Sequence, residues 1–216
     1  MKNKIAILST AYLPPIQYVT KFLLYDEIII DPTENYQKQS YRNRCNVFGA
    51  NGILSLSIPL NHDNPEHTPV KSMTISNNHD WQKIHWRSLE SAYRCSPFFE
   101  YYEDELKDFY FQKHDSLMHF NMDLLHTILG LLKIKTPISE ALDYKYDYSD
   151  IADDFRNVIH PKIKKIKPDP DFNSQRYIQV FESKFGFLEN LSIVDLLFCQ
   201  GPNSIEILRA SCNLNQ

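Results

Sequence analysis

Three cations and a serine hydroxyl recur within the ten residues Asn35–Arg44, and these side chains suit the binding of an anion. If the segment is extended, its side chains alternate between two faces. On one face then lie Lys38, Ser40, Arg42 and Arg44. A guanidinium presents a planar fork of donors that matches phosphate or carboxylate oxygens. The pattern predicts an anion site, although a solvated loop or a charged edge strand would have the same composition.

Histidines in the middle of the chain raise the question of a metal site. They are His62, His67, His79 and His85. Their separations do not match the i,i+4 pairs that helical metal ligands use, so we expect no metal. The sequence also has no GxGxxG and no P-loop, so no dinucleotide or nucleoside triphosphate cofactor is expected.

Two further patterns have both a chemical and a structural explanation. Trp81 and Trp86 flank His85, and such aromatics form either a core contact or a stacking wall for a planar or sugar group. One face of the helix predicted over 115–133 presents Asp115, His119, Asp123 and His126. These four side chains suit a cation or acid–base chemistry, but a solvated helix face has the same appearance.

The opening of the chain positions the candidate anion site. Residues 5–8 are a short apolar run, typical of a strand covered on both faces. The loop 9–15 follows, then apolar residues at helical spacing over 16–25, then a second strand over 27–31. Ligands of α/β sheets bind outside the carboxyl ends of the strands. We therefore expect the loop 9–15 and the residues after Asp31 to share one rim.

The remaining chain predicts further strands followed by helices. Asn51-Gly52 indicates a hairpin, and the other segments follow from alternation, helical spacing and caps. Strands are predicted over 45–48, 53–60, 70–75 and 143–148. Helices are predicted from Trp81 to the break at Ser96-Pro97 and over 98–111, 115–133, 149–159 and 192–198, with a final turn over 204–208.

The expected fold class is α/β, with an N-terminal strand–loop–helix–strand start and a mixed sheet, followed by a mostly helical C-terminal half. Residues 1–160 are expected to form an α/β core domain with a helical layer. Residues 161–216 are expected to form a helical segment packed on the same domain, after the basic, proline-bounded loop His160–Pro168.

Composition restricts the class of protein. The 216 residues are 43% hydrophobic, which is enough to build a core. A net charge of −4 and a pI near 6.1 argue against a nucleic-acid partner. No stretch reaches the roughly 18 apolar residues of a membrane span. Four widely spaced cysteines without a secretory segment indicate reduced thiols and a cytoplasmic protein, whose oligomeric state the sequence leaves open.

Five ordered motifs resemble the WbqC-like family of bacterial proteins, in the version seen in Bacteroidetes. They are KIAILSTAYLPPIQY, YDEIIID, NYQKQSYRNRCNVFGANGILSLSIPL, HDWQKIHWRSLESAYRCSPFFEYY and GFLENLSIVDLLFCQGPNS. The family's signature residues fall on Tyr12, Pro14, Tyr18, Asp26, Asn43, Arg44, Trp81, Tyr93, Ser192 and Asp195. Ser9-Thr10 stands where many relatives carry Gln-Pro, so no role of that glutamine is transferred.

The resemblance implies a role in O-antigen and other surface-polysaccharide synthesis. It favours a transferase acting on a phosphorylated or nucleotide-linked (amino) sugar, with acyl or aminoacyl transfer as the suggested reaction. Lys38, Arg42 and Arg44 would neutralise the phosphates. Tyr12, Tyr36 and Tyr41 would contact the base or sugar, and Asp26 or His79 would act as general base. Tyr18, Asn43 and Trp81 are expected to bind the substrate as well. The sequence shows no nucleophile–base pair.

Two other classes of protein remain open. Aromatic residues such as Phe98-Phe99 and Tyr101-Tyr102 suit a non-catalytic module that binds a partner or a glycan intermediate. The strand–loop–helix–strand start also suggests a nucleotidyltransferase-like enzyme, but the first loop lacks a histidine pair.

Overall fold

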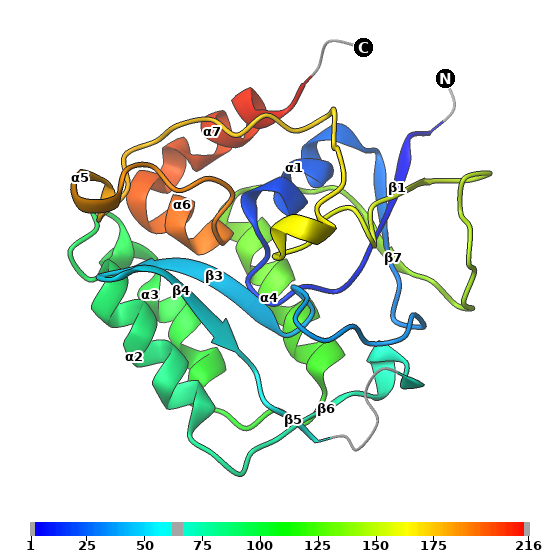
Figure 1. The fold of residues 1–216 in the computed structure, drawn as a ribbon, viewed down its shortest axis with the longest axis horizontal. Coiled ribbons are helices and arrows are strands. Elements are labelled where there is room, and N and C mark those ends of the chain that lie inside the picture. The colour runs from blue at the N-terminus through cyan, green and yellow to red at the C-terminus, as the bar shows by residue number, and fades with distance from the viewer. Residues whose placement is uncertain (1–2, 62–66, 214–216) are drawn as a thin grey trace.

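The chain folds into a four-stranded parallel sheet and a layer of helices (Figure 1). The structure is a computed structural model, which describes residues 3–61 and 67–213. Its strands are β1 (Ile5–Leu8), β2 (Glu27–Ile30), β3 (Arg44–Gly49), β4 (Gly52–Ser57), β5 (Leu60–Asn61), β6 (Thr74–Ile75), β7 (Ile138–Glu140) and β8 (Asp153–Asp154). Its α-helices are α1 (Ile16–Leu24), α2 (Trp81–Tyr93), α3 (Phe99–Lys107), α4 (Leu117–Leu131), α5 (Glu182–Phe185), α6 (Ile193–Gln200) and α7 (Ser204–Ser211). Short 3₁₀ turns are η2 (Val70–Ser72), η3 (Asp108–Tyr110), η4 (Ile163–Lys165) and η5 (Gly201–Asn203).

The parallel sheet has the strand order β7-β2-β1-β8. β1 pairs in register with β2, and β8 adds on the other side of β1. Both faces of β1 are covered, as the apolar run predicts. Ala6 and Leu8 belong to the main core, while Ile7 packs with Tyr148 and Ala152 on the opposite face. All four carboxyl ends therefore meet at one edge.

Antiparallel strands form two separate ribbons, β3–β4 and β5–β6. The predicted hairpin is confirmed, with Gly49 opposite Gly52. Gly52 has a φ of +98°, a conformation that glycine adopts without steric cost. The α/β class, the strand–helix–strand start and the mostly helical C-terminal half are confirmed. Parallel and antiparallel strands occupy different sheets.

The C-terminal helices complete the main core. α6 is buried over most of its length, and the Ser192 side chain caps it by accepting from the Val194 amide, as predicted. Lys21 of α1, fully buried, forms a 2.7 Å ion pair with Asp169. Ser192 also bridges to Pro15 at the start of α1. Residues after position 161 thus pack against the first helix, while the expected division at that point stays a prediction.

Three predicted elements are wrong. Residues 149–159 are not a helix, because Asp153–Asp154 instead pair with β1 as strand β8. Residues 143–148 are a loop rather than an edge strand. Residues 70–75 divide into the turn η2 and the two-residue strand β6. In each case tertiary contacts override a weak local pattern.

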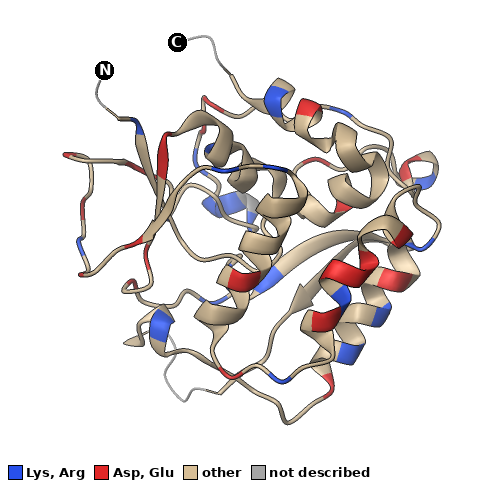
Figure 2. Cartoon of the chain, turned by 180° about the vertical axis from the view of Figure 1, so that it is seen from behind, with Lys and Arg blue, Asp and Glu red and all other residues tan. Residues whose placement is uncertain are grey.

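Charge is mixed along the chain (Figure 2). The helix α3 is acidic, with Glu100, Glu103, Asp104 and Glu105 within nine residues. The four cysteines are free thiols, and only Cys95 is exposed. Among the described residues, no helix combines the length and apolarity needed to cross a bilayer.

Candidate functional site

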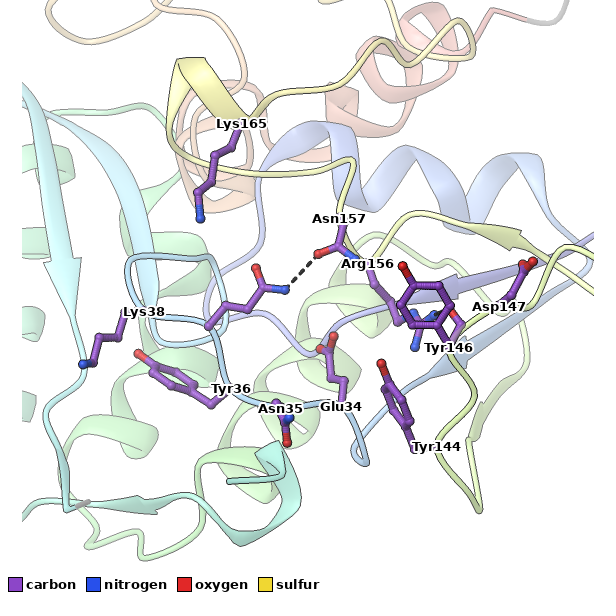
Figure 3. A pocket seen from close by; sticks show the side chains of 11 residues that line it. Glu34, Asn35, Tyr36, Lys38, Tyr144, Tyr146, Asp147, Arg156, Asn157 and Lys165 are labelled. Carbon is purple, nitrogen blue, oxygen red and sulfur yellow. Dashed lines mark hydrogen bonds between the residues drawn. The ribbon is translucent and has the colours of Figure 1, made fainter. Parts of the chain in front are cut away.

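A polar pocket of about 570 Å³ opens at the carboxyl edge of the parallel sheet (Figure 3). The loop after β2 contributes Glu34, Asn35, Tyr36, Gln37 and Lys38. The loop after β7 contributes Tyr144, Tyr146 and Asp147, and the segment after β8 contributes Arg156, Asn157 and Lys165. The residues after Asp31 line this edge, as predicted, whereas the loop 9–15 lines only a smaller adjoining hollow, through Ser9, Thr10 and Ala11.

Arg42 and Glu34 form a buried ion pair beside the pocket. The Arg42 guanidinium donates from Nε and Nη2 to the two Glu34 carboxylate oxygens, at 2.9 and 2.6 Å. Its Nη2 also donates to the Ser9 hydroxyl at 2.8 Å. Arg42 is only 2% exposed. Burial raises the pKa of Glu34, while the charge and hydrogen bonds of Arg42 act in the opposite direction. Arg42 is thus committed to an internal carboxylate.

Arg156 is the second buried arginine at this edge. It donates from Nη1 to Asp31 at 2.7 Å and from Nη2 to Asp154 at 2.5 Å. Burial lowers the pKa of Arg156, but the hydrogen bonds and charges of Asp154 and Asp31 outweigh it, so the pKa is raised. Two carboxylates surround one guanidinium, so its charge is balanced within the protein.

Exposed polar groups occupy the mouth of the pocket. Lys38 and Lys165 line the pocket, and Figure 3 shows them on the side opposite to Tyr144 and Tyr146. Gln37 donates to the Asn157 side chain at 2.8 Å, which links the loops after β2 and β8. Hydrogen bonds to Ser149 lower the pKa of Asp147. The pocket therefore offers lysines, amides and hydroxyls, the groups that bind phosphates and sugar hydroxyls.

The alternating faces expected for Asn35–Arg44 do not form. The segment turns at 38–39 and again at 41–42, and only Arg44 enters a strand. The Ser40 hydroxyl donates to the carbonyl of Gln37. Arg44 donates to the Ser57 hydroxyl at 2.9 Å. The expectation of one cationic face is wrong, because the turns send the cations to different partners.

Six of the predicted site residues gather near this edge. Tyr36 and Lys38 line the pocket. Tyr36 donates to Asn43 at 2.7 Å, and burial raises its pKa to about 12. Tyr18, Tyr41 and Arg42 line a smaller adjoining hollow, which shares Arg156 with the pocket. The Asn43 side chain accepts the hydrogen bond from Tyr36 and donates another to the carbonyl of Ile58.

Four predicted site residues lie elsewhere. Tyr12 and Trp81 are core residues, 0% and 4% exposed. Asp26 precedes β2, so it lies at the amino edge, where its carboxylate accepts from the Lys4 amide. His79 is exposed in the loop before α2. The sequence order of the motifs did not reveal that the sheet separates Asp26 from the pocket.

The Tyr12 hydroxyl is hydrogen-bonded to His85 Nδ1 and to the Tyr110 hydroxyl, each at 2.9 Å. Trp81 packs edge-on against His85 with ring centroids 5.1 Å apart. This is the core alternative for the two-tryptophan motif, and it surrounds the His85 ring with apolar groups. Burial lowers the pKa of His85 to about 4, despite a hydrogen bond with the backbone at Ser57.

Acidification should therefore destabilise the protein. Below about pH 6.5, the same histidine binds a proton in the unfolded chain but stays neutral in the folded protein. Each pH unit between the two pKa values therefore lowers the free energy of unfolding by about 1.4 kcal/mol. Stability should be constant above that pH and should fall as the pH falls toward the folded pKa. Urea unfolding at about pH 7.5 and about pH 5 measures the slope. His85→Gln should reduce this slope without abolishing it, because burial also lowers the pKa of His160 to about 4. The exposed His126→Gln should leave the slope unchanged, and equal slopes in both variants would contradict the assignment.

Sequence reasoning missed several pocket residues. Arg156 and Asn157 were placed in a helix, and Glu34 was not singled out. Tyr144 and Tyr146 belong to the tyrosine-charge alternation of 143–148, which was noticed as a strand pattern. Lys165 comes from the basic, proline-bounded loop His160–Pro168. The signals existed, but only the sheet brings them to one edge.

Within residues 3–61 and 67–213, no three His, Cys, Asp or Glu side chains form a group that could hold a metal ion. His62 lies outside the described residues. Asp115 precedes α4, whereas His119, Asp123 and His126 lie on it, and all four residues are exposed, as on a solvated surface.

Comparison with known proteins identifies the family. The family model described as "WbqC-like protein family" matches residues 10–161, which is more than half of the chain. The uncharacterized protein Rv1507c of Mycobacterium tuberculosis is 30% identical over 144 residues, which are 66% of this chain and 62% of the relative. The chain thus spans less than two thirds of the relative's length. No solved structure matches. The chain belongs to the WbqC-like protein family.

Proposed function

We propose that the chain is a cytoplasmic transferase of surface-polysaccharide or O-antigen synthesis, of the Bacteroidetes type, which acts on a phosphorylated or nucleotide-linked (amino) sugar. Family membership supports the link to polysaccharide synthesis, and it suggests acyl or aminoacyl transfer as the reaction. The single observation that carries the proposal is the polar pocket of about 570 Å³ at the carboxyl edge of the parallel sheet. This edge is where α/β folds bind their ligands.

The pocket residues have complementary roles in this proposal. Lys38 and Lys165 attract the phosphates, since ammonium groups donate charge-assisted hydrogen bonds to phosphoryl oxygens. Tyr36 and the amides of Gln37 and Asn157 contact the sugar hydroxyls. Arg42 acts behind them, by holding Glu34 in place.

Removing the rim lysines should weaken binding of a nucleotide sugar. A panel of nucleoside diphosphate sugars should raise the melting temperature of the wild type at millimolar ligand. Lys38→Ala combined with Lys165→Ala should weaken the affinity of the responding ligand by about tenfold or more, equivalent to about 1.4 kcal/mol. High salt should weaken wild-type binding as well, because these charges are exposed.

Lys113→Ala is the matched control, because this exposed lysine lies outside the pocket. A wild type that responds to no member of the panel would refute the proposal. Equal ligand affinity of the double variant and the control would show that these two lysines do not bind the ligand.

A partner-binding module is the second candidate function. Of its aromatic motif, Phe99 and Tyr102 are core residues, but Tyr101 is 69% exposed. Tyr101 borders a groove of about 580 Å³ between α3, the end of α4 and η5. A stable complex in pull-down and size-exclusion experiments, without turnover of any nucleotide sugar, would favour this function over the transferase. Turnover that transfers a nucleotidyl group would favour the nucleotidyltransferase-like alternative.

A further inference from the structure

The loop 143–148 carries three tyrosines at alternate positions, and they have different surroundings. Tyr148 is buried against Ile7 and Ala152 on the face of β1 away from the main core. Its hydroxyl donates to the carbonyl of Asp143, 3.2 Å away. Tyr144 and Tyr146 instead line the pocket, and they are 56% and 89% exposed. One tyrosine therefore anchors the loop, while the other two present their rings to the pocket.

Arg156 fixes the same loop through its main chain. Nη1 donates to the carbonyl of Lys145 at 3.1 Å, and Nη2 donates to the carbonyl of Tyr146 at 3.3 Å. The guanidinium also lies over the Tyr148 ring, 4.7 Å from its centroid. Asp31 and Asp154 hold the guanidinium itself, so the loop is tied to the ends of β2 and β8. Removing Arg156 would release the backbone that carries both pocket tyrosines.

The pocket consequently has two chemically different sides (Figure 3). Tyr144 and Tyr146 lie together on one side, and Lys38 and Lys165 lie on the other. Arg156 lies next to the tyrosines, but its charge is balanced by two carboxylates. Phosphate binding is therefore expected at the lysines, and the tyrosine side suits a ring with an apolar face.

We propose that Tyr144 and Tyr146 form a stacking wall for the ring of the ligand, and that Arg156 is the positioning residue that holds this wall. The inference rests on the proposed function of the pocket and specifies which part of the ligand each side binds. The shared chemistry is a flat or apolar ring face, which a nucleobase and a sugar both provide.

Three probes separate the two sides of the pocket by calorimetric titration. Pyrophosphate carries charge alone, a nucleoside diphosphate adds a base and its ribose, and a sugar 1-phosphate carries a sugar without a base. The double variant Tyr144→Ala with Tyr146→Ala should lower the affinity for a ring-bearing probe by about tenfold or more and should leave the affinity for pyrophosphate unchanged. A loss for the nucleoside diphosphate but not for the sugar 1-phosphate identifies the stacked ring as the base, and a loss for the sugar 1-phosphate identifies it as a sugar. Tyr144→Phe with Tyr146→Phe should bind as the wild type does, because the rings remain.

Arg156→Lys tests the positioning role. Lysine keeps the charge but not the fork of donors, so the loop should be released. This variant should weaken the same ring-bearing probe, spare pyrophosphate and speed chymotryptic cleavage within 143–148. Tyr101→Ala, at an exposed tyrosine outside the pocket, is the control for both experiments.

The outcomes distinguish the two proposals. If the wild type binds a ring-bearing probe and the double alanine variant binds it equally well, the stacking wall is wrong while the proposed function stands. If the wild type binds none of the probes, both are wrong. The two tyrosine side chains are exposed, so their variants should fold even if Arg156→Lys does not.

Discussion

Replacing Arg42 with alanine should destabilise the protein by about 3–5 kcal/mol, the cost of leaving one partner of a buried ion pair alone. Glu34 would lose both guanidinium bonds, at 2.9 and 2.6 Å, and it would remain buried at 5% exposure. The Ser9 hydroxyl would lose its donor as well. The effect follows from burial, so it should appear without any ligand.

Arg44→Ala is the matched control. Arg44 lies two residues away, is half-buried and donates to the neutral hydroxyl of Ser57, so its loss should cost only about 1 kcal/mol. Urea unfolding of both variants measures the difference. Equal stability of the two variants would show that the Arg42–Glu34 pair does not support the fold. Arg42→Met combined with Glu34→Leu should recover most of the lost stability, because it removes both charges.

Replacing Asp195 with alanine should cost about 3 kcal/mol, because buried donors would lose their acceptor. Its carboxylate is 0% exposed and accepts from the hydroxyls of Tyr93 and Tyr177, at 2.7 and 2.5 Å. Gln179 donates to it as well, at 3.1 Å. Burial raises the pKa of Asp195, and the three hydrogen bonds only partly oppose that shift. The network joins α2 to α6 and to the segment before α5.

Asp123→Ala on the exposed face of α4 is the control, and it should change the free energy of unfolding by no more than about 0.5 kcal/mol. Asp195→Asn should fall between the two, since one carboxylate oxygen is replaced by a donor. Thermal and urea unfolding at neutral pH measure all three variants. A loss for Asp195→Ala as small as that of the control would mean that the network adds nothing to stability.

Local patterns predicted the strongest elements of the fold. The apolar run Ile5–Leu8 and the helical spacing from Ile16 identify β1 and α1, because each carries its own periodicity. Ser192 identifies the start of α6 through its own hydroxyl. Asp153–Asp154 show no such pattern, and they become a strand only by pairing with β1. Short edge strands depend on their neighbours more than on their own residues.

The sequence predicted which stretch of chain borders the candidate site, but not which side chains line it. The rim after β2 follows from the chain order of strand, helix and strand. The partner of each cation does not follow from the chain order. Arg42 forms an ion pair with Glu34 because the chain turns twice between Lys38 and Arg44. Arg156 reaches Asp31 across 125 residues of sequence, a contact that no local spacing encodes.

By itself, the sequence determined the α/β class, the first strand–helix–strand unit and the stretch of chain that borders the pocket. Tertiary structure alone decided which cations serve the fold and which face the pocket. The physical reason is that burial assigns the partner of a charge. An arginine in the interior needs a carboxylate, whereas the ammonium group of an exposed lysine keeps its hydration.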